Sequence, residues 1–560
     1  MTASAQSIAV QASALAAQGH DQQAAALFEQ GLAAFPQDAR LANSAGNFHF
    51  KAGRLDTALA LFERALALAP GLVEAAVNAA ITLGRIGQPD RAVAMLAPLE
   101  QVGDRHPGYW RIRADCERQA KQFRAAERSI ARALVQDPGH PKTARSRARL
   151  SLECGDPEVV DHIEQALTLN PGNPELLFDY AQALAVAGRK SEALECTTML
   201  VQHLPGWTGG LKLHAELRWA AGDRAHFADH FAAAAAMPHA GPPIYHAWCE
   251  VLDGVDRHNE GAAILKSART IWPEDEGLAL ALAISLGEAG LAQEAQAVLD
   301  GFADVAAPAW ATARGRNLLR LGEVARAEQE LAKVLAANPD DVAAWALTDL
   351  CWRLSGDARH EWLHGQPGLV RSIAIALGSI ERDAITALLA QLHLHSAMPI
   401  GQSVKRGSQT KGSLFARGEP ELAQLEAALH EAMAEYRAGL PPADPRHPLL
   451  ARRDDPWAIV GSWSIRLDGE GHHAAHVHPH GLLSSASYWL VPDEVDANGQ
   501  PGWLELGNPP PGLAEGLGSL HTVRPKPGML VLFPSTLFHG TRPITQGARM
   551  TVAFDVNACG

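Results

Sequence analysis

Small and apolar positions recur with a regular period along the first 355 residues of the chain. One set returns after 34 positions, from Gly19, Ala24, Phe28 and Pro36 to Gly53, Ala58, Phe62 and Pro70. With small shifts the same spacing continues to Pro339, and it is least regular between Pro238 and Gly290. Each unit predicts two packed helices, because glycine ends the first, alanine lets the second approach, the larger apolar residue fills the space between them and proline stops the second.

This pattern resembles the tetratricopeptide repeat. The resemblance implies an N-terminal α-solenoid, a superhelix of stacked helix pairs with a concave groove. Such a groove is expected to bind an extended peptide or a protein partner, and the alternative is a spacer or dimerisation arm. Asn43, Asn47 and Asn78 lie on the expected inner helices and are candidates for contacts with a peptide backbone. The sequence names neither the partner nor the oligomeric state.

The pattern changes after Trp352, where the repeat frame is lost. Apolar positions from Trp362 to Leu394 predict a helical connector. Beyond it, alternating apolar and polar positions predict short strands over 458–467, 485–491, 503–506, 529–533 and 550–556. Many short strands favour a distorted jelly-roll barrel. We therefore expect an α + β multidomain chain with a solenoid over 1–355, a helical connector over 356–395 and a jelly roll over 396–560.

Histidines gather in this last region. His476 and His478 lie on one short segment, His539 follows at a distance, and Arg549 comes ten residues later. Two ligands on one segment, a distant third and a basic residue are what an open iron site needs when it also holds a dicarboxylate. Taken alone, the cluster also fits a solvated histidine-rich loop or an adventitious zinc site.

Several motifs in one order resemble the iron(II)/2-oxoglutarate oxygenases that carry N-terminal tetratricopeptide repeats. The motifs are Gln402-Ser403, Gly407 to Thr410, Gly461 to Leu467, His476-Val477-His478-Pro479, Ser484-Ser485-Ala486, Phe533-Pro534-Ser535, His539-Gly540-Thr541 and Arg549 to Asp555. The resemblance implies a double-stranded β-helix, Fe(II), 2-oxoglutarate as cosubstrate, and hydroxylation of a peptide or protein presented by the repeat groove.

The chain departs from the general pattern of this superfamily, which is histidine, any residue, aspartate and a distal histidine. Here His478 stands at the aspartate position. Either His476, His478 and His539 form an all-histidine face, or a carboxylate is supplied from elsewhere, for which Glu505 and Asp555 are the candidates by sequence. A frame that uses His478 and His480 is a further alternative.

The resemblance also implies a cosubstrate site. Arg549 is expected to hold the far carboxylate of 2-oxoglutarate in two hydrogen bonds, and Thr551, on the same strand face, could add a third. Tyr488 and Ser485 are candidates for lining the same pocket, and Arg466 is either a substrate contact or a paired structural charge. Three further residues are candidates for covering the substrate entrance: Gln402, Gln409 and Thr410.

Composition narrows the function classes. The formal charge of −14 disfavours unspecific binding to nucleic acid or to an anionic membrane. We see no signal peptide in residues 1–22 and no membrane span, so we expect a cytoplasmic protein. The six cysteines are scattered without metal-ligand spacing and fit reduced thiols in helix cores: Cys116, Cys154, Cys196, Cys249, Cys351 and Cys559.

Two rival functions stay open on the sequence. A three-histidine iron dioxygenase would use no 2-oxoglutarate, and Arg549 speaks against it. A non-catalytic peptide-binding scaffold would bind no iron. Release of succinate separates the first rival from the oxygenase, and iron binding separates the second.

Overall fold

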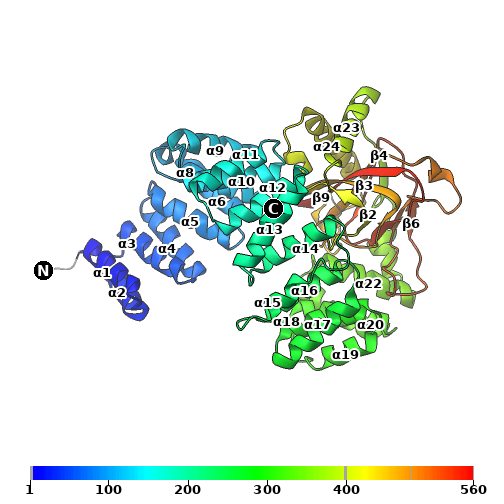
Figure 1. The fold of residues 1–560 in the computed structure, drawn as a ribbon, viewed down its shortest axis with the longest axis horizontal. Coiled ribbons are helices and arrows are strands. Elements are labelled where there is room, and N and C mark those ends of the chain that lie inside the picture. The colour runs from blue at the N-terminus through cyan, green and yellow to red at the C-terminus, as the bar shows by residue number, and fades with distance from the viewer. Residues whose placement is uncertain (1–3, 397–399, 480, 559–560) are drawn as a thin grey trace. The chain divides into compact units, whose positions relative to one another are not determined.

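The computed structural model of the chain describes residues 4–396, 400–479 and 481–558 (Figure 1). It divides into two compact units between Leu176 and Leu177, inside helix α12 (Pro174–Val186). The helices of the first unit, in chain order, are α1 (Ala5–Ala17), α2 (Asp21–Ala34), α3 (Ala39–Lys51), α4 (Leu55–Leu68), α5 (Val73–Arg85), α6 (Pro89–Leu96), α7 (Glu100–Gly103), α8 (Tyr109–Gln119), α9 (Phe123–Gln136), α10 (Pro141–Cys154) and α11 (Val159–Leu169).

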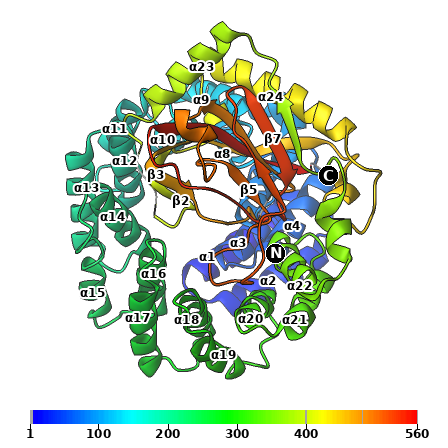
Figure 2. The same ribbon diagram turned by 90° about the vertical axis from the view of Figure 1, so that its right-hand side faces the viewer.

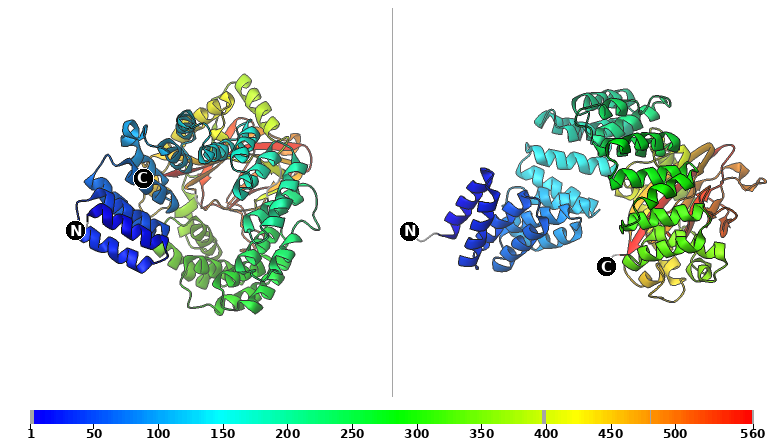
Figure 3. Two further views of the ribbon diagram at one scale, coloured as in Figure 1. Left: turned by 60° about the vertical axis from the view of Figure 1, so that its left-hand side comes forward. Right: turned by 90° about the horizontal axis from the view of Figure 1, so that it is seen from below.

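The second unit contains the rest of the helical region. Its helices are α13 (Lys190–His203), α14 (Thr208–Ala220), α15 (His230–Ala235), α16 (Pro242–Asp253), α17 (His258–Ile271), α18 (Glu276–Glu288), α19 (Ala292–Asp300), α20 (Pro308–Arg320), α21 (Val324–Ala337), α22 (Val342–Ser355), α23 (Ser379–Leu392) and α24 (Pro420–Ala438). Helices α13 to α22 follow one another in an arc beside the β-strands (Figures 2 and 3). None of the described helices combines the length and apolar character of a bilayer-spanning segment.

The repeat positions pack as the pattern predicts. Ala58 and Phe62 are fully buried, and a Cβ added at Gly46 would come within 2.5 Å of the Phe62 ring. First helices of successive pairs also contact one another, and in the second unit they form the row α14, α16, α18, α20 and α22. Asn43 and Asn78, the candidates for peptide contacts, bond to each other: Asn78 Nδ2 donates a hydrogen bond to Asn43 Oδ1 at 3.0 Å.

A left-handed residue closes the turn inside almost every helix pair. These residues follow one another at intervals of 32 to 34 positions: Gly19, Gly53, Gly87, Lys121, Gly155, Gly188, Gly222, Asp256, Gly290, Gly322 and Gly356. Lys121 (φ 60°) and Asp256 (φ 63°) take the place of glycine. The region between Pro238 and Gly290 therefore looks irregular in sequence, although α16 and α17 pair there like the other helices.

The strands form two antiparallel sheets. The larger has the order β1-β7-β4-β9-β3-β2, and the smaller has the order β6-β5-β8. Their bounds are β1 (Arg371–Ala374), β2 (Val404–Gln409), β3 (Trp457–His473), β4 (Leu483–Leu490), β5 (Leu504–Leu506), β6 (His521–Val523), β7 (Met529–Pro534), β8 (His539–Thr541) and β9 (Ala548–Ala558). Apolar residues of α23 and α24 pack on one face of the larger sheet, so the fold is the expected β-domain after a helical solenoid.

Part of the predicted connector belongs to this β-domain. Residues 371–374 form β1, which pairs with β7 and brings Ile373 opposite Leu530. The segment reads as helical because its buried residues Leu369, Ile373 and Ile375 do not alternate over a full strand length. Helix α24 and strands β2, β6 and β8 were not predicted, and three residues in β6 and β8 are too few to show a period.

A buried histidine pins α23 to the larger sheet. His393 lies 2.9 Å from Ser408 Oγ through Nδ1 and 2.9 Å from Ser464 Oγ through Nε2. Since Ser464 Oγ donates to the Thr551 carbonyl at 3.1 Å, it accepts from His393. Burial lowers the pKa of His393 to about 4.

The His393 contact predicts a pH-dependent stability. The unfolded chain takes up a proton near pH 6.5 that the folded chain refuses until about pH 4, so stability falls as the pH drops through this window, by about 3 kcal/mol for this group. The slope of the unfolding free energy against pH measures how many protons the chain takes up on unfolding. We expect His393→Gln to lower this number by close to one between pH 4 and pH 6.5. Urea titrations over a pH series measure it, and an unchanged slope contradicts the prediction.

The left-handed backbone at Lys121 predicts that glycine at this position stabilises the surrounding helix pair. Lys121→Gly relieves about 1 kcal/mol of backbone strain, so amide exchange in the α8–α9 hairpin should slow about fivefold. Lys121→Ala keeps the strain and should not slow exchange. Gly87→Ala adds strain without a clash, because no atom lies within 4 Å of the new Cβ, and should speed exchange in α5 and α6.

Candidate metal centre

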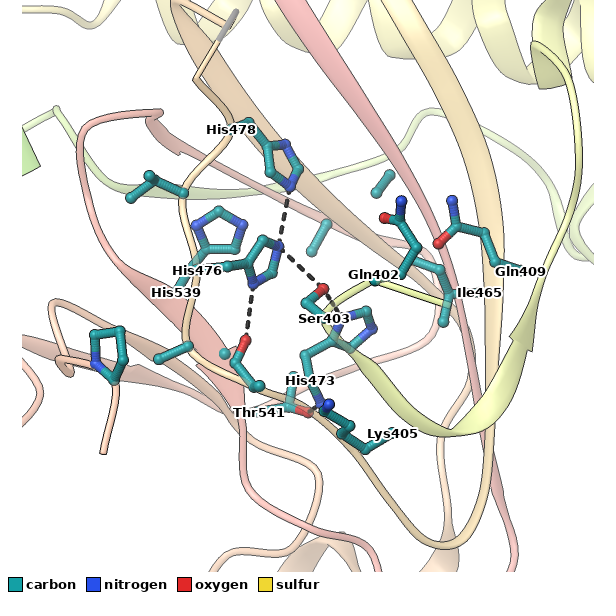
Figure 4. A pocket seen from close by; sticks show the side chains of 18 of the residues that line it. Gln402, Ser403, Lys405, Gln409, Ile465, His473, His476, His478, His539 and Thr541 are labelled. Carbon is teal, nitrogen blue, oxygen red and sulfur yellow. Dashed lines mark hydrogen bonds between the residues drawn. The ribbon is translucent and has the colours of Figure 1, made fainter. Parts of the chain in front are cut away.

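Three histidines meet at one point between the two sheets (Figure 4). His476 and His539 exchange two backbone hydrogen bonds, of 3.0 Å and 2.9 Å, and His478 follows two residues after the first. The ring centroids lie 4.2 Å apart for His476 and His539, 5.0 Å for His476 and His478, and 4.9 Å for His478 and His539. One nitrogen of each ring lies within 4.8 Å of the others, which suits a shared metal ion.

The Nδ1 atoms point away from this centre, each toward an acceptor. His476 Nδ1 lies 2.8 Å from the Ala474 carbonyl, and His539 Nδ1 lies 3.1 Å from the Leu537 carbonyl. His478 Nδ1 lies 2.5 Å from Asp555 Oδ1. These acceptors assign the proton to each Nδ1 and make each Nε2 the accepting nitrogen, and His476 Nε2 also lies 3.3 Å from Ser403 Oγ. Such partners orient histidine ligands in metal sites.

The Nε2 atoms of His476 and His478 are 3.0 Å apart. Two lone pairs at this distance repel each other unless a proton or a cation lies between them. Burial, and then the neighbouring His478, lowers the pKa of His476 to about 4, and burial lowers the pKa of His539 well below its usual value. Both rings are therefore neutral at neutral pH, and neutral imidazoles bind a metal cation.

Neither candidate carboxylate joins the histidines. Asp555 lies behind His478, on β9, and Glu505 accepts from Arg542 Nε at 3.0 Å and from Ser519 Oγ at 3.2 Å. Among the described residues, the metal-ligand cluster contains only histidines. His480 lies outside the described residues. The all-histidine alternative is the arrangement that the structure displays.

Arg549 lies in the same cavity and is only 2% exposed. Its Nε has no hydrogen-bond partner, and no carboxylate pairs with its guanidinium in the described part of the chain. Its guanidinium carbon stands 5.1 Å from the centroid of the Tyr488 ring. Burial lowers the pKa of Arg549. A buried cation without a counter-ion is costly, so this position fits an anionic ligand.

The other predicted site residues occupy different places. Thr551 lines the cavity. Ser485 also lines it, but its hydroxyl donates to the Phe554 carbonyl and accepts from the Phe554 amide, both at 2.8 Å. Tyr488 lies in the apolar cluster beside Arg549, and the guanidinium acts to lower the pKa of its buried hydroxyl, against the larger effect of burial, which raises it. The Ser485 hydroxyl thus joins β4 to β9, and the Tyr488 ring packs beside the Arg549 guanidinium.

The remaining candidates divide in the same way. Arg466 pairs with Asp468 at 3.0 Å and has the character of a structural charge. Thr410 Oγ1 accepts from the Ser464 amide at 2.9 Å and joins β2 to β3. Gln402 and Gln409 line the cavity.

The cavity has a volume of about 900 Å³ and takes part of its wall from the repeat helices. Asp253 of α16, Glu288 of α18 and Arg316 of α20 line it, all from the row of first helices. Glu288 and Arg316 form an ion pair at 2.9 Å. Sequence reasoning missed these three residues, because charged positions on a repeat helix resemble those of any solvated face.

His473 is a further residue that the sequence pattern missed. It lines the cavity, with its ring centroid 6.1 Å from that of His476. Ser403 Oγ lies 3.2 Å from His473 Nδ1 and 3.3 Å from His476 Nε2. The adjacent pair His472 and His473 was the available signal, since both precede the ligand segment directly.

Comparisons with known families agree with this geometry. Residues 461–555, which contain all three histidines and Arg549, match the family model described as "Putative 2OG-Fe(II) oxygenase". Residues 49–116, 10–73 and 312–357 match models described as "Tetratricopeptide repeat". No curated protein matches the chain.

Several solved structures are similar to parts of the chain. A tetratricopeptide repeat protein from Parabacteroides merdae is 15% identical, covers 44% of this chain and 97% of its own, and has a TM-score of 0.37. PilF of Pseudomonas aeruginosa is 16% identical, with coverages of 37% and 94% and a TM-score of 0.31. YrrB, described as a TPR protein with an unusual peptide-binding site, is 16% identical, with coverages of 33% and 95% and a TM-score of 0.28.

The acceptor behind His478 predicts an effect on metal affinity. Asp555→Asn keeps the shape but weakens the charge-assisted hydrogen bond to His478 Nδ1, so iron(II) affinity should fall about tenfold or more. Anaerobic competition with a chromophoric chelator measures it. Glu505→Gln is the matched control and should leave the affinity unchanged, whereas loss of iron in that variant would make Glu505 a ligand.

Proposed function

Because this chain joins tetratricopeptide repeats to a C-terminal domain of the 2OG-Fe(II) oxygenase family, we propose that it is an iron(II)- and 2-oxoglutarate-dependent dioxygenase. One observation carries the proposal. One ring nitrogen from each of three histidines lies within 4.8 Å of the others, in the same cavity as Arg549, a buried guanidinium without a counter-ion among the described residues.

The residues of the site fit both groups. The three histidines would hold iron(II) on one face, and imidazole is a suitable ligand for this ion. Arg549 would bind the far carboxylate of 2-oxoglutarate in two parallel hydrogen bonds, with Thr551 as a third donor. Asp555 keeps His478 in the tautomer that offers Nε2. When bound together, iron(II), 2-oxoglutarate and dioxygen oxidise a substrate C–H bond to C–OH while the oxo acid becomes succinate and carbon dioxide.

The substrate that we propose is a peptide or protein. A cavity of about 900 Å³ can hold the cosubstrate and a side chain of a larger molecule. Its wall includes Asp253, Glu288 and Arg316 of the repeat helices, so a bound segment would meet both the repeats and the histidines. Backbone amides and polar side chains of a peptide would match these groups.

A second candidate is a three-histidine iron dioxygenase that needs no 2-oxoglutarate. The absence of a carboxylate from the described metal cluster favours it. Arg549 disfavours it, because a site without a dicarboxylate leaves this buried cation uncompensated. Succinate production separates the two enzymes, and a scaffold without iron binding would be neither.

The test is an anaerobic titration of iron(II) with and without 2-oxoglutarate, followed by the visible charge-transfer band of the chelate. We expect the His539→Ala variant to lose both iron binding and the charge-transfer band. Arg549→Gln should keep the iron but need about a hundredfold more 2-oxoglutarate, the scale of two charge-assisted hydrogen bonds. Arg466→Gln is the matched control and should behave as the native protein, because Arg466 pairs with Asp468 outside the cavity.

Each failure has a distinct meaning. Stoichiometric iron without a band overturns the use of 2-oxoglutarate and favours the three-histidine enzyme. No iron binding, together with tight peptide binding, favours the scaffold.

A further inference from the structure

A second cavity of about 280 Å³ adjoins the metal cavity. Gln402, Gln409 and Trp463 line both of them. The Trp463 ring also lies 5.5 Å from the His478 ring, measured between centroids. The two cavities therefore share these three side chains as part of their walls.

The two glutamines offer unused hydrogen-bonding groups. Neither the Gln402 nor the Gln409 side chain bonds to another residue in the part of the chain that the structure describes, and Figure 4 shows both amides on the same side of the histidines. Each carboxamide has donors on nitrogen and an acceptor oxygen. This combination matches the alternating carbonyl and N–H groups of an extended peptide backbone.

Glu216 of α14 is the acidic residue among the described residues that line the second cavity. It is partly buried beside Val186, Leu217 and Leu392, and burial raises the pKa of its carboxyl group. Among the described residues it forms no ion pair and no hydrogen bond. A cationic ligand group would offset the cost of this half-buried carboxylate.

Two lysines also line the second cavity, Lys190 and Lys411, and both are exposed. Neither lies within ion-pair distance of Glu216, although the positive charge of Lys411 acts to lower the pKa of Glu216 and so opposes part of the effect of burial. The apolar wall around Glu216 instead suits the long alkyl stem of a basic side chain.

We propose that the second cavity is a specificity pocket for a lysine or arginine side chain of the substrate. The substrate backbone would pass Gln402 and Gln409 in extended form, with a nearby residue of the same peptide in the metal cavity. The pocket rests on the proposed peptide hydroxylation and adds the class of substrate: a peptide with a basic residue close to the oxidised one.

The test uses the full chain with iron(II) and 2-oxoglutarate under anaerobic conditions. A pooled library of acetylated, amidated heptapeptides is equilibrated with the protein, and bound peptides are identified by mass spectrometry. We expect enrichment of lysine or arginine about tenfold or more over norleucine, the scale of one charge-assisted contact. Glu216→Gln should abolish that preference while keeping the pocket shape.

Two further variants sharpen the result. Glu192→Gln, at an exposed position of α13, is the matched control and should keep the preference. The double variant Gln402→Ala/Gln409→Ala should weaken the binding of basic and neutral peptides alike, because it removes only contacts with the peptide backbone. Far-ultraviolet circular dichroism checks that each variant is folded.

The outcomes separate the pocket from the proposed function. No enrichment, enrichment of acidic peptides, or a basic preference that survives Glu216→Gln overturns the pocket. The charge-transfer band reports the oxygenase site independently. A band without basic preference refutes the pocket alone, and a Glu216-dependent preference without a band supports the pocket while refuting the oxygenase.

Discussion

The double hydrogen bond between the backbones of His476 and His539 is the constraint on which the site depends. It joins residues that are 63 positions apart and sets their ring centroids at 4.2 Å. The close approach explains the residue that follows the distal histidine, because a Cβ at Gly540 would lie 2.8 Å from the His473 carbonyl oxygen. Strand β8 then pairs with β5 on its other side, so the distal histidine is held within a sheet rather than on a free loop. A ligand fixed by backbone hydrogen bonds keeps its position when the metal is exchanged.

Burial makes this constraint electrostatically useful. It keeps His476 and His539 neutral, so their lone pairs are available, and it deprives Arg549 of water. The centre thus suits two ligands of opposite sign, a cation among the imidazoles and an anion at the guanidinium. A metal ion chelated by a dicarboxylate supplies both at once. Each ligand lowers the cost of the other's binding site, since opposite charges attract strongly in a cavity of low dielectric.

The sequence predicted the parts of this molecule that depend on local order. Helix pairs follow from small residues at fixed spacing, and the three histidines with Arg549 stand out by their motifs. Non-local contacts were out of reach. The position of Asp555 behind His478 depends on the register of β4 with β9, which places Ser484 opposite Asp555. The turns at Lys121 and Asp256 could not be recognised in the sequence, because these residues are not glycine and their left-handed backbone is visible only in the structure. Glu216 and Arg316 each line a cavity, and this placement depends on how the first helix of each repeat faces the strands.

The last repeat helix is joined to the β-domain through its core, which changes how the repeats are understood. Asp349 of α22 lies 3.0 Å from His364 Nδ1, and His364 Nε2 lies 2.9 Å from Thr536 Oγ1. Arg353 of α22 donates to the Gly507 carbonyl at 2.6 Å, and Phe538, adjacent to the distal ligand, packs in one cluster with Leu347 and Leu350. The packing of α22 and the position of His539 are therefore coupled. Helix α20, which contributes Arg316 to the cavity wall, and Phe538, which precedes His539, share this core, so a change in the repeats that shifts α22 is expected to shift the histidine cluster as well.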